Sequence, residues 1–225
     1  PGSDFAEGLG NGVIRYVLAG AVGGDGSRAR PFGSIGQATS FTGPQLIAVG
    51  KGQYSERVLL RAEVELVGAC AAETQVLGTV LLRGHRGNVR GLSFTATGAV
   101  SLIIDEVSDT LLSKVAVAGT VQVEGNSSAT FVEARLGGPR LELNEGDVAL
   151  QSSELHGSVG VDRGTFSAED SALTATAAPS QIIATNAEVS LLRSLVELGV
   201  YGDSGSPIRA QRSWFTQRLP SSGLS

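Results

Sequence analysis

The chain is short of cysteine, of aromatic residues and of long apolar runs, and these shortages exclude several classes of protein. Cys70 is the single cysteine among 225 residues, so neither an intrachain disulfide nor a cysteine-based metal site can form. Its surroundings, VGACAAE, indicate a buried strand and turn in which the thiol packs. No apolar run approaches the ~18 residues of a membrane-spanning helix, and no signal peptide is visible.

Charge is also scarce and leans acidic. Charged residues make up 17% of the chain and the formal net charge is −5. No basic stripe is present that could follow a phosphate backbone. Nucleic acid is therefore not an expected partner.

The beginning and end of the sequence suggest a piece of a larger protein. The chain has no methionine and starts with PGS, which resembles the remnant of a cleaved tag. We expect a trimmed domain of a secreted or cell-surface bacterial protein. The expected organisation is a tag remnant (1–3), an N-terminal strand and cap (4–44), the main repetitive domain (45–215) and a tail or linker (216–225).

Glycine is plentiful and the aliphatic residues recur in short runs. Glycine accounts for 31 residues and aromatic residues for 5%, which favours many turns around a core of Val, Leu, Ile and Ala. From about Val89 onward, runs of β type alternate with Gly, Asn, Asp and Ser, without helical periodicity. Two series of inward-facing candidates recur at intervals of ~20 residues: Phe94, Val117, Leu136, Leu155 and Leu173, and Ile103, Val123, Leu143, Val161 and Ile183.

Three short strands per ~20 residues predict an all-β solenoid, the single-stranded parallel β-helix. Each lap forms one turn, and equivalent positions stack ~4.8 Å apart. An antiparallel sandwich is the alternative, but the two series stay aligned over five laps, and Asn-Gly or Asp-Gly hairpin signals are scarce. About seven to nine turns are expected.

The front of the chain carries a family resemblance. The segment IRYVLAGAVGGDGSRARPFGSIGQA (14–38) is followed by QLIAVGKGQYSERVLL (45–60) and VELVGACAAETQVL (64–77). This order resembles the opening of right-handed parallel β-helix proteins of the pectate-lyase-like superfamily. In that group a strand and a GxDG loop precede PFxxIxxA, and the first turns follow as I.V..G.Y.E.V.L and L.G. The resemblance implies a right-handed coil with a short N-terminal capping helix.

Both ends of a β-helix expose strand edges and core, which invite aggregation unless they are covered. Phe32, Ile35 and Ala38 have helical spacing and are predicted to cover the first end. Intervening glycines keep this helix short. Trp214 and Phe215 are predicted to plug the far end, and the alternative for Trp214 is stacking on a sugar.

Polar residues follow the second series of strands and form a predicted acidic turn column. Lap-by-lap alignment places Ile104, Glu124, Asn144, Asp162 and Ala184 in one row, and Asp105, Gly125, Glu145, Arg163 and Thr185 in the next. The acidic turn column comprises Asp105, Glu124, Asn144, Glu145 and Asp162. Its oxygens could hold Ca²⁺ or, with carboxylates about 5 Å apart, serve glycoside hydrolysis. Solvated turns are the simpler interpretation, because acidic residues and asparagine also suit turns.

No complete catalytic set can be assigned from the sequence. Lyases of the superfamily carry an arginine or lysine base beside aspartate-bound Ca²⁺, and its pectin esterases carry an aspartate pair with an arginine; neither set can be placed here. Glu133, Arg135 and Glu154 could line an outer groove, although alternating surface charges explain them as well. His85 and His156 have no serine–histidine–acid or metal-ligand spacing.

The leading functional interpretation is a non-catalytic module for surface display, adhesion or glycan binding. A glycan or a cell-surface protein is the expected partner, and no cofactor is expected apart from the Ca²⁺ considered above. A polysaccharide-active lyase or glycoside hydrolase is the alternative. A structural subunit that associates end to end is the third hypothesis.

Overall fold

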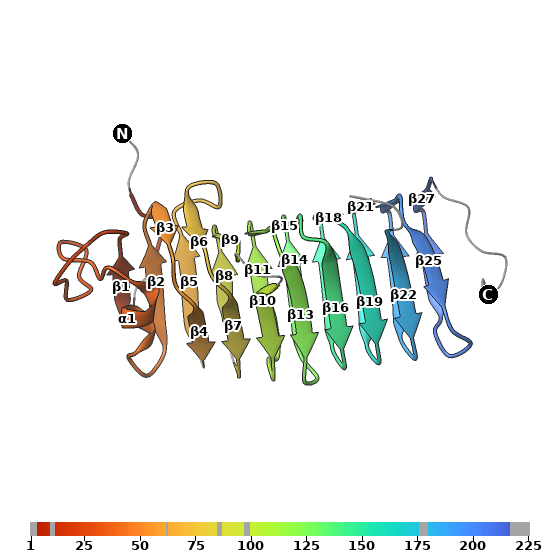
Figure 1. Cartoon of the computed structure of the whole chain (residues 1–225), viewed down its shortest axis with the longest axis horizontal. Coiled ribbons are helices and arrows are strands. Elements are labelled where there is room, and N and C mark those ends of the chain that lie inside the picture. Colours follow the sequence, from red (N-terminus) through yellow and green to blue (C-terminus); the bar gives the residue numbers. More distant parts are fainter. Residues whose placement is uncertain are drawn as a thin grey trace.

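The computed structural model describes residues 4–9, 12–61, 63–84, 87–96, 100–175 and 180–216. They form an elongated right-handed parallel β-helix (Figure 1), which confirms the predicted fold class. Three parallel sheets run along its axis. Every strand pairs with its equivalents in the neighbouring turns, and the eight strands of the smallest sheet define eight complete turns, within the predicted range.

The three sheets are named here by their number of strands. The ten-stranded sheet contains β1 (Ile14–Val17), β2 (Gln45–Val49), β5 (Val64–Gly68), β8 (Asn88–Arg90), β11 (Thr110–Ser113), β14 (Ser128–Val132), β17 (Asp147–Gln151), β20 (Thr165–Glu169), β23 (Glu188–Leu192) and β26 (Ile208–Gln211). The nine-stranded sheet contains β3 (Gly52–Tyr54), β6 (Thr74–Val76), β9 (Ser93–Phe94), β12 (Ala116–Val117), β15 (Arg135–Leu136), β18 (Glu154–His156), β21 (Ala172–Thr174), β24 (Leu195–Val196) and β27 (Trp214–Phe215). The eight-stranded sheet contains β4 (Val58–Arg61), β7 (Val80–Arg83), β10 (Val100–Asp105), β13 (Thr120–Glu124), β16 (Arg140–Asn144), β19 (Ser158–Asp162), β22 (Gln181–Thr185) and β25 (Gly199–Gly202).

The first predicted column of inward residues is confirmed in the nine-stranded sheet. These residues stack in consecutive strands and are all buried: Phe94, Val117, Leu136, Leu155 and Leu173. Successive side chains of a strand point to opposite faces, so every second residue enters the core. This alternation carries one apolar ladder through the length of the rod.

The second predicted column is wrong at its two ends. Val123, Leu143 and Val161 are buried as expected. Ile103 and Ile183 lie instead on the outer face, because their strands are offset by one residue from the predicted alignment. A one-residue offset moves a side chain to the other face of a sheet.

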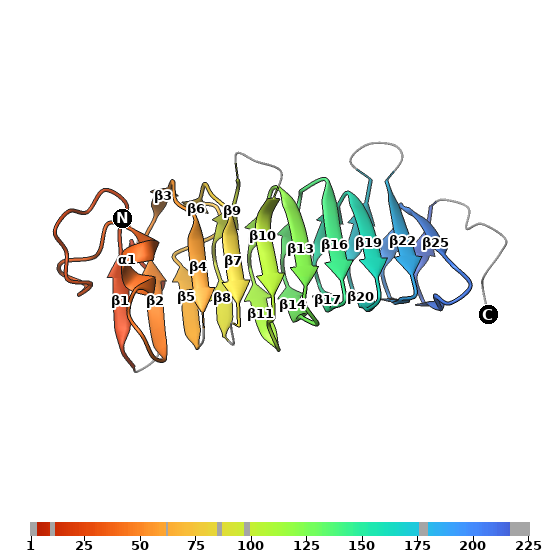
Figure 2. The same cartoon turned by 60° about the horizontal axis from the view of Figure 1, so that its bottom comes forward.

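A short helix covers the N-terminal end of the core, as predicted. Helix α1 (Ile35–Thr39) lies beside β1 and β2 at this end of the rod (Figure 2). It buries Ile35 and Ala38, and Phe32 is also buried. The Ser34 side chain accepts a hydrogen bond from the Gln37 N–H and caps the helix. In the described ranges, no helix is long and apolar enough to span a membrane.

The predicted plug at the far end is wrong for Trp214. Phe215 stacks on Val196 and packs partly against the core. Because neighbouring side chains of a strand alternate in direction, Trp214 points outward, and 77% of it is exposed. Trp214 therefore does not cover the end of the core.

Candidate functional site

A shallow groove on the outer face of the eight-stranded sheet is the candidate site. It has a volume of about 220 Å³ and lies over β16, β19 and β22. Gly160 forms its floor, because the strand register places Glu142 on one side of the glycine and Ile183 on the other. A Cβ atom at Gly160 would lie 3.1 Å from Nη2 of Arg140, so the arginine side chain reaches over the glycine. The missing side chain at position 160 therefore hollows the surface.

Hydrogen-bonding groups surround this floor. The wall at the strand ends consists of three polar residues in register: Asn144, Asp162 and Thr185. On the neighbouring strand, one carboxylate oxygen of Glu142 accepts a hydrogen bond from Gln122 Nε2 at 3.0 Å. The other oxygen lies 3.1 Å from Nε of Arg140. Glu142 and Arg140 are thus held in place by their partners on the surface.

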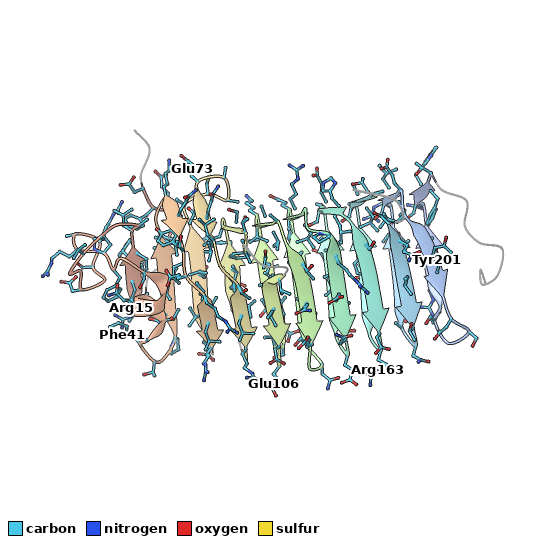
Figure 3. The ribbon with its side chains drawn as sticks, viewed as in Figure 1. Arg15, Phe41, Glu73, Glu106, Arg163 and Tyr201 are labelled. Atoms are coloured by element: carbon cyan, nitrogen blue, oxygen red, sulfur yellow. The ribbon has the colours of Figure 1, made fainter. Side chains whose placement is uncertain are left out.

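The side of the groove across Gly160 from Glu142 is apolar. Ile183, which lines the groove, is 41% exposed, and Tyr201, its partner on β25, is 47% exposed. The Tyr201 ring lies along its own strand, because a Cβ atom at Gly199 would come within 2.8 Å of it (Figure 3). The surface therefore combines a polar wall with exposed aliphatic and aromatic carbon.

The acidic turn column lies at the edge of the same sheet. Four of its residues form one row: Asp105, Glu124, Asn144 and Asp162. Glu145 belongs to the next row, at a turn position with a φ of 60°. Asn144 and Asp162 thus belong both to this column and to the wall of the groove.

The predicted alignment of the column is wrong by one residue in β10 and β22. Ile104 and Ala184 were expected beside the acidic residues, whereas they pair with Val123 and Val161 in the core. Strand β10 has an irregular register near its start, and the connection from β21 to β22 is longer than that from β18 to β19. Both features shift the spacing that the alignment relied on.

Arginines neutralise much of the acidic column. Nε of Arg83 lies 3.1 Å from a carboxylate oxygen of Asp105. Arg163 pairs with Glu145 and lies 3.3 Å from Asp162; Figure 3 shows it at the turn edge of the sheet. Among the described residues, no group of three or more His, Cys, Asp or Glu side chains is placed to hold a metal ion. The expectation of bound Ca²⁺ therefore gains no support.

The second predicted site, a groove at Glu133, Arg135 and Glu154, is divided between two surfaces. Glu133 lies at the corner after β14, where its carboxylate is 3.6 Å from Nζ of Lys114. Arg135 and Glu154 are partners in adjacent strands of the nine-stranded sheet and form an ion pair at 3.6 Å. All three side chains are more than half exposed. These residues form surface ion pairs, which agrees with the simpler interpretation of alternating surface charges.

Sequence reasoning missed the residues that shape the groove: Arg140, Glu142, Gly160 and Ile183. One signal was present, a glycine at an outward position of the alternating strand SVGVD. Glycine within a strand often marks a close approach of another group. Its neighbours on the adjoining strands follow only from the register.

A larger hollow of about 520 Å³ lies at the N-terminal end of the ten-stranded sheet. It is lined by parts of β2, β5 and β8 and by the segment that precedes β1. Arg90 and Glu65, which face it, lie 3.5 Å apart and pair with each other. None of the predicted site residues lies there.

Comparison with known proteins identifies the fold. No protein-family model matches the sequence, and no curated protein does either. Among solved structures, pectin methylesterase PemA from Erwinia chrysanthemi matches with a TM-score of 0.66 and 11% identity, covering 96% of this chain and 93% of that one. Pectin methylesterase from carrot matches with a TM-score of 0.59 and 13% identity, covering 95% and 86% respectively. At such identities the likeness shows a shared right-handed β-helix and no more.

Proposed function

We propose that this β-helix is a non-catalytic glycan-binding module that seats a neutral polysaccharide on the outer face of its eight-stranded sheet. The groove over Gly160 carries the proposal, because its open floor is bordered by a polar wall at the strand ends and by the apolar side chain of Ile183 on one side. Sugar rings present hydroxyl groups at their edges and C–H groups on their faces. They therefore suit a surface of this mixed chemistry.

The dimensions favour a chain-like ligand over a small enclosed one. The volume of about 220 Å³ is below the roughly 300–1,000 Å³ of pockets that enclose drug-sized ligands. One sugar ring suits this space while the rest of the polymer continues along the rod. Successive turns repeat every ~4.8 Å and offer further polar positions along the axis.

The charge of the surface favours an uncharged polymer. The chain has a formal net charge of −5, and the carboxylates of Glu142 and Asp162 face the groove. Arg140 and Arg163 already pair with these carboxylates. A polyuronate would meet excess negative charge without a free cationic partner, so a neutral glycan is the better ligand.

One observation favours a second candidate, polysaccharide de-esterification or cleavage. The two structural neighbours are named as pectin methylesterases, and two carboxylates and an arginine line this groove. Methanol release from methyl-esterified pectin and the appearance of new reducing ends measure these activities. Turnover that disappears in Asp162→Asn would overturn the non-catalytic proposal.

Secretion to a bacterial cell surface, with a role in display or adhesion, belongs to the same proposal. A rigid rod with a lateral glycan site suits contact between a surface and a polysaccharide. Localisation of the full-length protein in its cell tests this part.

Calorimetric titration tests the binding proposal. Oligosaccharides of neutral β-linked glucose, xylose and galactose are compared with polygalacturonate. Glu142→Gln and Asp162→Asn each keep an acceptor oxygen but remove one charge from the groove. Each should weaken binding of a neutral ligand about tenfold, because a neutral hydrogen bond is roughly 1–1.5 kcal/mol weaker than a charge-assisted one.

Glu188→Gln is the matched control, because it removes a carboxylate from the outer face of the ten-stranded sheet, where Glu188 pairs with Arg209 at 2.6 Å. It should leave affinity unchanged. If all three variants lose the same affinity, the effect comes from the net charge of the protein. The proposal that the groove binds the glycan would then be overturned.

A further inference from the structure

A second exposed surface lies on the nine-stranded sheet near the C-terminal end of the rod. We call it the Trp214 surface, and it consists of Glu154, His156, Ala172, Thr174, Leu195 and Trp214. Its apolar row follows the strand pairing, in which Leu195 lies between Ala172 and Trp214. Leu195 is 37% exposed and Trp214 is 77% exposed. Three consecutive strands thus present apolar carbon of increasing size to solvent.

A polar row runs beside the apolar one. Thr174 is the partner of His156 in the adjacent strand, and its Oγ1 lies 2.6 Å from Nδ1 of the histidine. The other ring nitrogen of His156 lies 3.4 Å from Glu154, which also pairs with Arg135. These contacts fix the orientation of the imidazole and the carboxylate.

The exposure of Trp214 calls for a ligand or partner. Tryptophan presents the largest apolar surface of any side chain, and exposed apolar patches with polar neighbours commonly mark binding sites. Its outward direction removes the end-capping role that the sequence suggested. The sugar-stacking role that was its alternative remains.

The electrostatics of the surface select the kind of ligand. The charge of Glu154 is compensated by Arg135 on the neighbouring strand β15. The carboxylate of Glu197, which lies beside Thr174 in the strand register, adds negative charge, so the surface disfavours an anionic ligand. A neutral ligand with one apolar face and a polar edge complements adjacent apolar and polar rows.

We propose that the Trp214 surface is a second glycan contact, in which Trp214 and Leu195 stack against the face of a neutral sugar ring. Glu197 and Thr216 continue the polar row beside Leu195 and Trp214, and they then hydrogen-bond to the hydroxyl groups at the edge of that ring. This inference rests on the proposed function, but it concerns a different sheet from the groove over Gly160. Only Gly157 separates β18 from β19, so the two surfaces meet at one corner of the same turn.

The composition of the chain supplies a selective probe. Trp214 is the only tryptophan, so intrinsic tryptophan fluorescence reports on this surface alone. Titration with the same neutral oligosaccharides should shift the emission to shorter wavelength and protect it from acrylamide quenching. Trp214→Ala should lower the calorimetric affinity about tenfold, and Trp214→Phe should retain part of it because an aromatic face remains.

The outcomes separate this inference from the proposed function. Calorimetric binding without a fluorescence change, and with full affinity in Trp214→Ala, would overturn the second contact and leave the groove proposal intact. Absence of binding by either method would overturn both. A fluorescence change that depends on protein concentration without glycan would identify a self-association surface and also overturn the inference; sedimentation velocity measures this.

Discussion

Two glycines that lie close together in the sequence, Gly160 and Gly164, show how a missing side chain shapes the surface or the packing of the turns. A Cβ atom at Gly160 would meet the tip of the Arg140 side chain at 3.1 Å, and that flexible tip can move. A Cβ atom at Gly164 would lie 2.0 Å from the carbonyl oxygen of Gly146, which belongs to the backbone of the preceding turn. The first glycine opens a groove, whereas the second permits two turns to approach.

Alanine at each position should therefore have opposite consequences. Gly160→Ala should fold with a stability within about 0.5 kcal/mol of the parent and bind glycan more weakly, because Arg140 is displaced into the groove. Gly164→Ala should lose about 1–3 kcal/mol of unfolding free energy through overpacking. Urea unfolding and calorimetric titration measure the two effects. A large stability loss in Gly160→Ala would show that this glycine serves packing instead.

Among the secondary-structure elements, mostly buried serines occupy the corner between the ten-stranded and nine-stranded sheets in the later turns. We call this the serine ladder, and it consists of Ser153, Ser171, Ser194 and Ser213. In each step a hydroxyl oxygen accepts the backbone N–H of the equivalent residue one turn earlier. The same hydroxyl donates to a carbonyl of its own turn. The ladder thus satisfies buried backbone groups that the strands leave free.

Removal of one step should be costly. Ser171→Ala leaves the buried N–H of Ser153 without its acceptor, and an unsatisfied buried donor costs about 1–3 kcal/mol. Ser167→Ala, on the outer face of β20, removes the same hydroxyl without this consequence and should stay within about 0.5 kcal/mol. Chemical denaturation of both variants measures the difference. Equal stability of the two would mean that a water replaces the serine oxygen.

These elements also mark the limits of what the sequence reveals. Alternation of side chains predicted the column from Phe94 to Leu173 because each strand there places one apolar residue between outward-facing neighbours, and the strand pairing continues without an irregularity. The acidic row slipped by one residue where β10 has an irregular register. The contact between His156 and Thr174 depends on the pairing of β18 with β21. Such lateral contacts lie beyond a single-sequence pattern, because one residue of offset exchanges the two faces of a strand.

For the molecule as a whole, the N-terminal end is closed by contacts between the cap and the first turn. The Glu56 carboxylate accepts hydrogen bonds from the N–H groups of Ile35 and Gly36, both at 2.8 Å. The Tyr54 hydroxyl donates to the Gly50 carbonyl at 2.8 Å and accepts from the N–H of Ala19 at 3.2 Å. Tyr54 is only 3% exposed, so it joins the core to the segment that covers it.

Burial of Tyr54 should make the stability of the rod sensitive to alkaline pH. Burial is the main reason that the pKa of its hydroxyl rises from 10.0 to about 12. In the unfolded chain this tyrosine loses its proton near pH 10, while the folded chain keeps it. The folded state should thus hold its full stability below pH 10 and lose up to about 2–3 kcal/mol as the pH rises to 12.

Denaturant unfolding at pH 9 and pH 11.5 measures this loss, and Tyr54→Phe should abolish the part that Tyr54 causes. That variant should also lose about 1 kcal/mol at neutral pH, since the Gly50 carbonyl and the Ala19 N–H lose their partner. Tyr201→Phe is the matched control: Tyr201 is exposed, so its removal should leave the alkaline loss in place. If Tyr54→Phe loses as much unfolding free energy between pH 9 and pH 11.5 as the parent does, the loss comes from another group. Deprotonation of Tyr54 would then not weaken this end of the rod.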